Sequence, residues 1–300
     1  MSPSPKRATI VGVLLLAIAG ISIAAPLIRL SEAHPLAIAT WRLLYAMLFV
    51  IPALLVGGGW RQYATLTRKE LALALFAGVM LAAHFWTWNA SVDLTSVAAS
   101  TVLVNLQPVV VALLSAWWLH ERPERGQWLG IAIAMVGAMV LVIPDLRGGA
   151  IAEGRNPLLG DALAIAGGVT AALYYLIGRR LRQKLDLWPY AALVYGACLF
   201  SLLGAVLAAN VPLGGYAANE HGIFIALAIG PMMLGHTGMN WALKHLPAYV
   251  VNLTVLGEPV GATLIAAMLP GIREIPGPWV LLGGILILGG IVVAGRRATR

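Results

Sequence analysis

The chain has 300 residues, of which 60% are hydrophobic and only 11% are charged, and its mean hydropathy is +0.86. A soluble globular protein usually has about 25% charged residues. This composition therefore excludes a water-soluble body and indicates an integral membrane protein. The formal net charge is +8, and the only cysteine is Cys198. A single cysteine excludes an internal disulfide and a cysteine-based metal site.

Apolar runs bounded by charged, proline and loop residues predict ten membrane-spanning helices. A bilayer core about 30 Å thick needs a helix of about 20 apolar residues. We expect the first run to be a retained span and not a signal peptide, because many similar runs follow it. In chain order, the expected spans are 8–29, 35–57, 70–91, 94–119, 126–144, 157–178, 188–209, 221–243, 247–269 and 277–295.

The loops between these spans divide unequally in basic residues. Fifteen of the 20 Lys and Arg residues fall on the side that holds both termini, and four fall on the opposite side. Because cytoplasmic loops carry the excess of Lys and Arg, we expect both termini in the cytoplasm and a multi-pass protein of a bacterial-type inner (plasma) membrane. The basic residues then serve as topology signals, and the high net charge requires no nucleic-acid partner.

A shift of 152 residues places GVMLAAHFWTWNASVDL (78–94) on GPMMLGHTGMNWALKHL (230–246). The shift pairs His84 with His236, and a shift of 151 pairs Pro108 with Pro259. We therefore expect two five-helix repeats, residues 1–147 and 148–300. Because each repeat has an odd number of spans, the second repeat has the opposite orientation in the membrane. Inverted repeats are typical of transporters, whose substrate site lies near the membrane midplane.

The polar residues inside the repeated spans predict a substrate-binding cavity. Helical spacing puts Met80, His84 and Trp88 on one face, and a polar residue inside the bilayer tends to face a cavity or a partner. The alternative is interhelical packing with hydrogen bonds across helices. We expect Phe85 and Trp86 to pack or to contact lipid instead. The complete set of expected substrate-binding residues is Met80, His84, Trp88, Asn105, Gln107, Tyr175, Met232, His236, Asn240 and Glu258.

Two charged residues within the spans allow more than one interpretation. Glu258 is expected near the middle of its span, where it either binds an amine or takes a proton during transport, or is held neutral beside Pro259. Its repeat mate, Gln107, cannot titrate. Arg42 could attract a substrate carboxylate, but pairing with a carboxylate of the chain or reaching the headgroups is the interpretation we favour.

Prolines and glycines indicate how the spans bend and pack. Pro26, Pro108 and Pro259 interrupt helical hydrogen bonding, which makes them either hinges for transport or static kinks. The repetition at Pro108 and Pro259 favours the hinge. Glycines in the fifth and tenth spans, such as Gly130 and Gly290, permit close helix contact and predict a scaffold surface or a homodimer surface.

The Pro-containing stretches VNLQPVVVALLSAWWLHERPERGQWLGIAIAMVGAMVLV and VLGEPVGATLIAAMLPGIREIPGPWVLLGGILILGGIVVA resemble the ten-span EamA-type exporters of the drug/metabolite transporter superfamily. Glu121 matches a Glu that this family commonly has before its fifth span, and Arg42 matches a frequent Arg of the second span. Ile272 stands opposite Glu121 in the second repeat, so the two copies differ there. The resemblance covers nearly the whole chain. It implies export of amino acids or related metabolites, and one branch of the family exports aromatic amino acids.

These observations predict a secondary exporter of amino acids or related small metabolites that works by alternating access. A multidrug exporter of cationic amphiphiles and a non-transporting scaffold or sensor are the alternatives. The sequence has no Walker loop, no GxGxxG after a strand and no HExxH. We therefore expect no enzymatic activity, no catalytic residues, no cofactor and no metal, with a small molecule and the lipid bilayer as partners.

Overall fold

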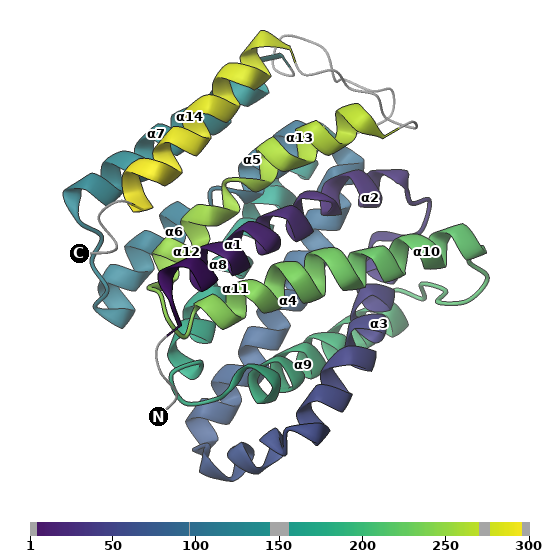
Figure 1. The fold of residues 1–300 in the computed structure, drawn as a ribbon. Helices are drawn as coiled ribbons and strands as arrows, with labels where there is room; N and C mark the ends of the chain where they lie inside the picture. The colour runs from purple at the N-terminus through teal and green to yellow at the C-terminus, as the bar shows by residue number, and fades with distance from the viewer. Residues whose placement is uncertain (1–4, 96, 145–155, 270–276, 296–300) are drawn as a thin grey trace.

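The computed structural model describes residues 5–95, 97–144, 156–269 and 277–295, and these residues form a bundle of helices without strands (Figure 1). The first half contains α1 (Arg7–Ser22), α2 (Ala24–Leu30), α3 (Pro35–Val56), the 3-10 helix η1 (Gly59–Thr65), α4 (Arg68–Leu94), α5 (Val97–Val104), α6 (Gln107–Leu114), the π-helical η2 (Ser115–Leu119) and α7 (Arg125–Pro144). The second half contains α8 (Pro157–Leu181), α9 (Leu187–Ala208), α10 (Ala218–Leu227), the π-helical η4 (Ala228–His236), α11 (Thr237–Ala242), α12 (Ala248–Val255), α13 (Glu258–Met268) and α14 (Pro278–Gly295).

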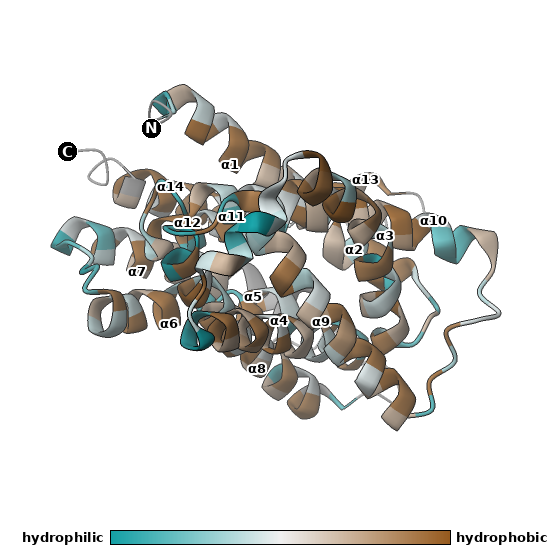
Figure 2. Ribbon diagram, turned by 90° about the horizontal axis from the view of Figure 1, so that it is seen from below, coloured by the Kyte–Doolittle hydropathy of each residue, from teal (hydrophilic) through white to brown (hydrophobic). Residues whose placement is uncertain are grey.

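The helices match a multi-pass membrane protein. Within the described residues, eight helical stretches are long and apolar enough to cross a bilayer, and the apolar parts of α7 and α14 are shorter. Large apolar side chains such as Leu48, Val56 and Phe200 are exposed on the outside of the bundle. Figure 2 shows apolar residues along the helices and polar residues mainly near the helix ends. The apolar runs of the sequence therefore predicted the positions of the helices to within a few residues.

Several predicted spans are interrupted where the sequence alone suggested one continuous helix. The first span breaks at Ile23 between α1 and α2. The fourth breaks at Asn105 and Leu106 between α5 and α6, and the ninth breaks at Leu256 and Gly257 between α12 and α13. The eighth changes from α-helix to π-helix at η4 and back again at α11. Each of the three breaks precedes an expected hinge proline by a few residues, because proline cannot donate to the preceding turn.

Local signals fix several helix ends. The Thr67 side chain accepts from the backbone N–H of Glu70, and the Glu70 carboxylate accepts from the backbone N–H of Thr67, which forms a capping box at the start of α4. Asn156 accepts from the backbone N–H of Leu159 and caps α8. These caps set the entry points of α4 and α8, two helices that pack against each other along their length.

The helix contacts of one half recur in the other half. α4 packs against α8, and at the equivalent place η4 and α11 pack against α1. α6 packs against α8 as α13, which begins at the equivalent proline, packs against α1. α3 contacts α9, α6 contacts α12 and α7 contacts α14, which are pairs of equivalent spans. The arrangement is thus approximately unchanged when the two halves are exchanged.

α7 and α14 lie side by side at one edge of the bundle (Figure 1). A Cβ atom on Gly130 would lie 2.6 Å from the carbonyl oxygen of Gly290, and one on Gly290 would lie 2.5 Å from the carbonyl oxygen of Gly130. Only residues without a side chain permit this approach. The predicted small-residue surfaces of spans five and ten thus contact each other within one chain.

Gly78 of α4 should be required for close packing against α9. A Cβ atom there would lie 2.6 Å from the carbonyl oxygen of Val194 and 2.5 Å from the Cβ atom of Ala197, whereas a Cβ atom on Gly196 of α9 would meet nothing within 4 Å. We expect Gly78→Ala to lower the free energy of unfolding by about 1–3 kcal/mol through overpacking. Thermal unfolding in detergent measures the effect. Gly196→Ala is the matched control because it introduces the same methyl group into a helix. Equal stability of the two variants would contradict this packing.

Candidate functional site

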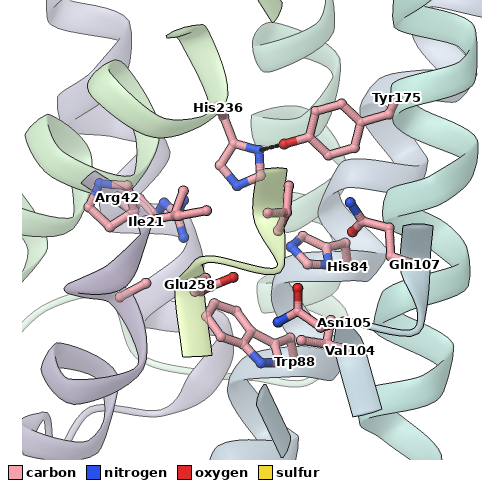
Figure 3. A pocket seen from close by; sticks show the side chains of 13 residues that line it. Ile21, Arg42, His84, Trp88, Val104, Asn105, Gln107, Tyr175, His236 and Glu258 are labelled. Carbon is pink, nitrogen blue, oxygen red and sulfur yellow. Dashed lines mark hydrogen bonds between the residues drawn. The ribbon is translucent and has the colours of Figure 1, made fainter. Parts of the chain in front are cut away.

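A small cavity lies where the two halves of the bundle meet (Figure 3). Its volume is about 30 Å³, which holds only one or two water molecules. Polar and charged side chains dominate the labelled lining in Figure 3, although the surrounding helices are apolar. The lining residues are Ile21, Ala24, Arg42, His84, Trp88, Val104, Asn105, Gln107, Tyr175, Pro231, His236, Val255 and Glu258.

The two histidines paired by the repeat meet at this cavity. The ring centroids of His84 and His236 are 6.0 Å apart, and the edge of one ring faces the other. The His84 ring is stacked on Trp88 at 5.9 Å, and the His236 ring is stacked on Tyr175 at 6.2 Å. Each half therefore contributes a histidine stacked on an aromatic ring.

Hydrogen bonds orient both imidazoles. His84 Nδ1 lies 3.0 Å from the carbonyl oxygen of Gly167. Because a carbonyl can only accept, Nδ1 carries the proton and donates, and Nε2 is then the acceptor of the neutral ring. His236 Nδ1 lies 3.4 Å from the hydroxyl of Tyr175 (Figure 3). These bonds hold the rings at the cavity wall.

The helix breaks deliver amide and carboxyl groups to the same cavity. Asn105 lies in the break between α5 and α6, Gln107 begins α6 and Glu258 begins α13. The Gln107 amide donates to the side-chain oxygen of Asn252 on α12, so the two broken spans are bonded to each other. Glu258 and Asn105 both line the cavity. The broken backbone lines a cavity, which is where irregular backbone is tolerated inside a membrane.

Seven of the ten expected substrate-binding residues line this cavity, and Met80, Met232 and Asn240 lie elsewhere. Met80 is partly buried against the apolar core, about one helical turn from His84. Met232 is fully buried in that core. Met232 was expected to share a face with His236, but the intervening helix is π-helical and its turns contain more residues than α-helical turns. Positions four apart therefore do not align there.

Asn240 belongs to a buried hydrogen-bond network beside the cavity. Its amide nitrogen donates to the hydroxyl of Tyr174 at 2.5 Å and to the hydroxyl of Tyr195 at 3.1 Å, and its backbone carbonyl accepts from Arg182 Nε at 2.9 Å. Tyr195 also contacts the hydroxyl of Thr237 at 3.0 Å. This network joins α8, α9 and α11 and holds the helix that begins directly after His236.

Arg42 does not take the position that we favoured from the sequence. Its side chain is 1% exposed, so it does not reach the headgroups. No carboxylate lies within 4.0 Å of it among the described residues. Its guanidinium instead lies over the ring of Phe85, 4.1 Å from the centroid. The position of Arg42 along its own span could not predict this contact, because Phe85 belongs to a different span. Phe85 is fully buried and Trp86 is 46% exposed, as expected for a packing residue and for one facing lipid.

The lining also contains residues that the sequence analysis missed. Their side chains are mostly aliphatic, and nothing distinguishes them from the other apolar residues of the spans. Pro231, in the π-helical segment, is the one residue whose type could have indicated a special position. The missed apolar residues are Ile21, Ala24, Val104, Pro231 and Val255.

Hydrogen bonds bridge the two halves at one end of the bundle, here called the Glu220 end. Glu220 of α10 accepts from the Ser31 hydroxyl at 2.5 Å and from the backbone N–H of Glu32 at 3.0 Å. Tyr45 of α3 contacts His221 Nδ1 at 3.0 Å. The turn between α2 and α3 is thereby fastened to the start of α10.

Ion pairs bridge the halves at the opposite end, here called the Glu121 end. Arg179 Nε donates to Glu121 at 2.7 Å, and the second carboxylate oxygen of Glu121 accepts from the backbone N–H of Ala248 at 3.1 Å. Lys184 pairs with Glu70 at 2.7 Å. The cavity thus lies between two bridged ends.

The EamA-like transporter family model matches the chain twice, over residues 6–143 and 158–296. The chain belongs to this family. The two matches correspond to the two halves described above, and the relatives that carry a functional name are transporters and not enzymes. Within the described residues, no three His, Cys, Asp or Glu side chains lie together as metal ligands would.

Relatives of this EamA-family protein come from archaea and bacteria. An uncharacterised transporter of Archaeoglobus fulgidus is 29% identical over 72% of this chain and 75% of its own length. A probable terminal-alkyne amino-acid exporter of Streptantibioticus cattleyicolor is 26% identical over 66% of this chain and 64% of its own, so the match spans less than two thirds of that relative. A pseudopaline exporter of Pseudomonas aeruginosa is 23% identical over 63% of each chain.

A solved crystal structure has the same fold. It covers 98% of this chain and 99% of its own with a TM-score of 0.75, at 21% sequence identity. At this identity the likeness concerns the fold alone.

The pair of Arg179 with Glu121 should hold the Glu121 end closed. We expect Arg179→Ala to remove about 1 kcal/mol from the closed form and so to increase opening about fivefold. The measurement is the thiol-labelling rate of a cysteine placed at Met239, a fully buried residue between the cavity and that end, with Cys198 replaced by alanine. Lys69→Ala removes an exposed charge at the same end, beside Glu70, and is the control. Labelling that is equally slow in both variants would contradict the closure.

Proposed function

We propose that this protein is a secondary exporter of amino acids or related small metabolites and that it works by alternating access. The observation that supports this most is the cavity itself, because it lies between two similar halves and gathers buried polar groups from both. Substrate sites of repeat transporters lie at such an interface. The amino-acid exporter and the pseudopaline exporter among the relatives agree with this class of substrate.

The topology we propose has ten spans arranged as two inverted five-helix repeats, residues 1–147 and 148–300. Both termini and the Glu121 end then face the cytoplasm of an inner membrane, because most Lys and Arg residues are on that side. The recurring helix contacts support the repeat. An inverted repeat can exchange the roles of its halves, which is the geometric basis of alternating access.

Transport requires the cavity to widen. Ligand pockets usually measure about 300–1,000 Å³, far more than the cavity of about 30 Å³ found here. We propose that Pro26, Pro108 and Pro259 act as hinges, since each lies just beyond a break in its span. Bending at these breaks would move the wall residues without disturbing the α7–α14 scaffold.

The counterflow experiment described below distinguishes two other functions. A multidrug exporter of cationic amphiphiles would use Glu258 and the aromatic walls in the same way, and a scaffold or sensor would transport nothing. The buried Arg42 beside the cavity, which forms none of the described ion pairs, favours a substrate with a negative group over an amphiphilic cation.

Counterflow in proteoliposomes tests the function. The purified protein is reconstituted, and radiolabelled amino acids and cationic dyes are offered with and without a pH gradient. We expect at least one amino acid to exchange and the dyes not to. Movement of dyes alone would assign the multidrug function, and no movement of any solute would contradict transport.

Fast counterflow should require the side chains that form the cavity wall. We expect His84→Ala, Trp88→Ala and His236→Ala each to lower the counterflow rate, because each removes part of the wall that contacts substrate. Trp86→Ala is the control, since it truncates a tryptophan that faces outward on the same helix. Protein in the membrane is quantified for every variant. Wild-type rates in all three cavity variants would show that these residues only pack.

A further inference from the structure

The cavity carries one positive and one negative side chain that do not pair with each other. Arg42 comes from α3 in the first half, and Glu258 comes from α13 in the second half. Both are buried, with 1% and 6% of their surface exposed. Both line the same cavity, but no Arg42 nitrogen lies within 4.0 Å of a Glu258 oxygen among the described ion pairs.

Among the described residues, Arg42 has fewer hydrogen-bond partners than a buried guanidinium requires. It has five N–H donors, its Nε is buried without any partner, and the contact found for its charge is the face of Phe85. A cation–π contact stabilises the charge and fixes its position, but leaves the planar donors free. A charge at this depth is tolerated when it faces a cavity or a substrate pathway. The free donors of Arg42 therefore fit a carboxylate that arrives with the substrate.

Glu258 lines the same cavity from the second half of the chain. Figure 3 shows Glu258 among Arg42, Trp88, Asn105 and the two histidines, all of which line the cavity. A carboxylate with an aromatic wall nearby is suited to an ammonium group. His84 donates through Nδ1 to the carbonyl of Gly167, and no ion pair joins it to Glu258 among the described residues. The cavity thus holds one cationic and one anionic side chain.

We propose that Arg42 and Glu258 together select zwitterions, with Arg42 binding the substrate carboxylate and Glu258 binding its ammonium group. This inference rests on the proposed transport function and assigns the substrate class of the same cavity. A free amino acid carries both groups on one carbon atom and can approach both side chains at once. A cation without a carboxylate leaves Arg42 unpaired and brings a second positive charge toward it, which disfavours binding.

The wild-type protein gives a test that is independent of mutagenesis. The amino acid with the fastest counterflow is compared with its methyl ester, which lacks the carboxylate, and with its N-acetyl derivative, which lacks the ammonium group. Each derivative is offered as a competitor. We expect each to compete about 10- to 100-fold less well than the free amino acid, as expected for one lost charge-assisted hydrogen-bonding partner. Equal competition by all three would overturn the inference.

Two variants test which side chain binds which charged group of the substrate. We expect R42Q to slow transport of the free amino acid and to reduce the preference for acid over ester about tenfold or more. We expect E258Q to reduce the preference for the free amine over its N-acetyl form in the same way. R42K keeps the charge and should retain part of the acid preference, which separates charge from folding. R61Q removes an exposed arginine charge outside the cavity and should change neither ratio.

The outcomes separate the inference from the proposed function. If no amino acid moves in the wild-type protein, the transport function is wrong and the inference with it. If an amino acid moves and R42Q leaves the ratio of acid to ester unchanged, the inference alone is wrong. If the double variant R42Q/E258Q regains wild-type transport of the free amino acid, the two side chains act only as a structural pair, which also overturns the inference. Elution of each variant as a single symmetric peak checks that it folds.

Discussion

The burial of Arg42 among apolar helices is the constraint on which the rest of the site depends. A charge inside a membrane requires compensation, and the nearby compensation is the face of Phe85 at 4.1 Å. Phe85 is held in turn by α4, and its ring meets His236 edge-on at 5.2 Å. One cation therefore connects α3, α4 and the π-helical η4, and the cavity is the space that this cluster leaves open toward Glu258.

Broken helices give the cavity its chemistry and its capacity to change. A continuous helix satisfies its own backbone, whereas irregular backbone inside a membrane is tolerated where it lines a cavity, as at the breaks at Asn105 and Leu256. Gln107 and Asn252 make one such bond between the two broken spans. The α7–α14 pair lies apart from these breaks and is held by glycine contacts. The structure thus combines a closely packed edge with a centre of broken helices.

The helices and most of the cavity lining could be predicted from the sequence, for physical reasons that differ by residue. Apolar run length locates spans because bilayer thickness sets helix length. The pairing of His84 with His236 located the cavity because histidine is rare in such spans. Met232 and Asn240 do not line the cavity, and for Met232 the π-helical turns before His236 alter the register of residues four apart. Arg42 was expected elsewhere because Phe85, its aromatic partner, comes from a different span.

Measuring the distances across both ends of the bundle at once tests alternating access most directly. Spin labels at Glu32 and Asn219 span the Glu220 end, and labels at Arg122 and Lys244 span the Glu121 end, all exposed positions. Electron-spin distance distributions are recorded in liposomes with and without the transported amino acid, with Cys198 replaced. Alternating access predicts that a condition that lengthens one distance leaves the other short, because the two ends never open together. Two distances that lengthen together, or that ignore a transported substrate, would contradict it.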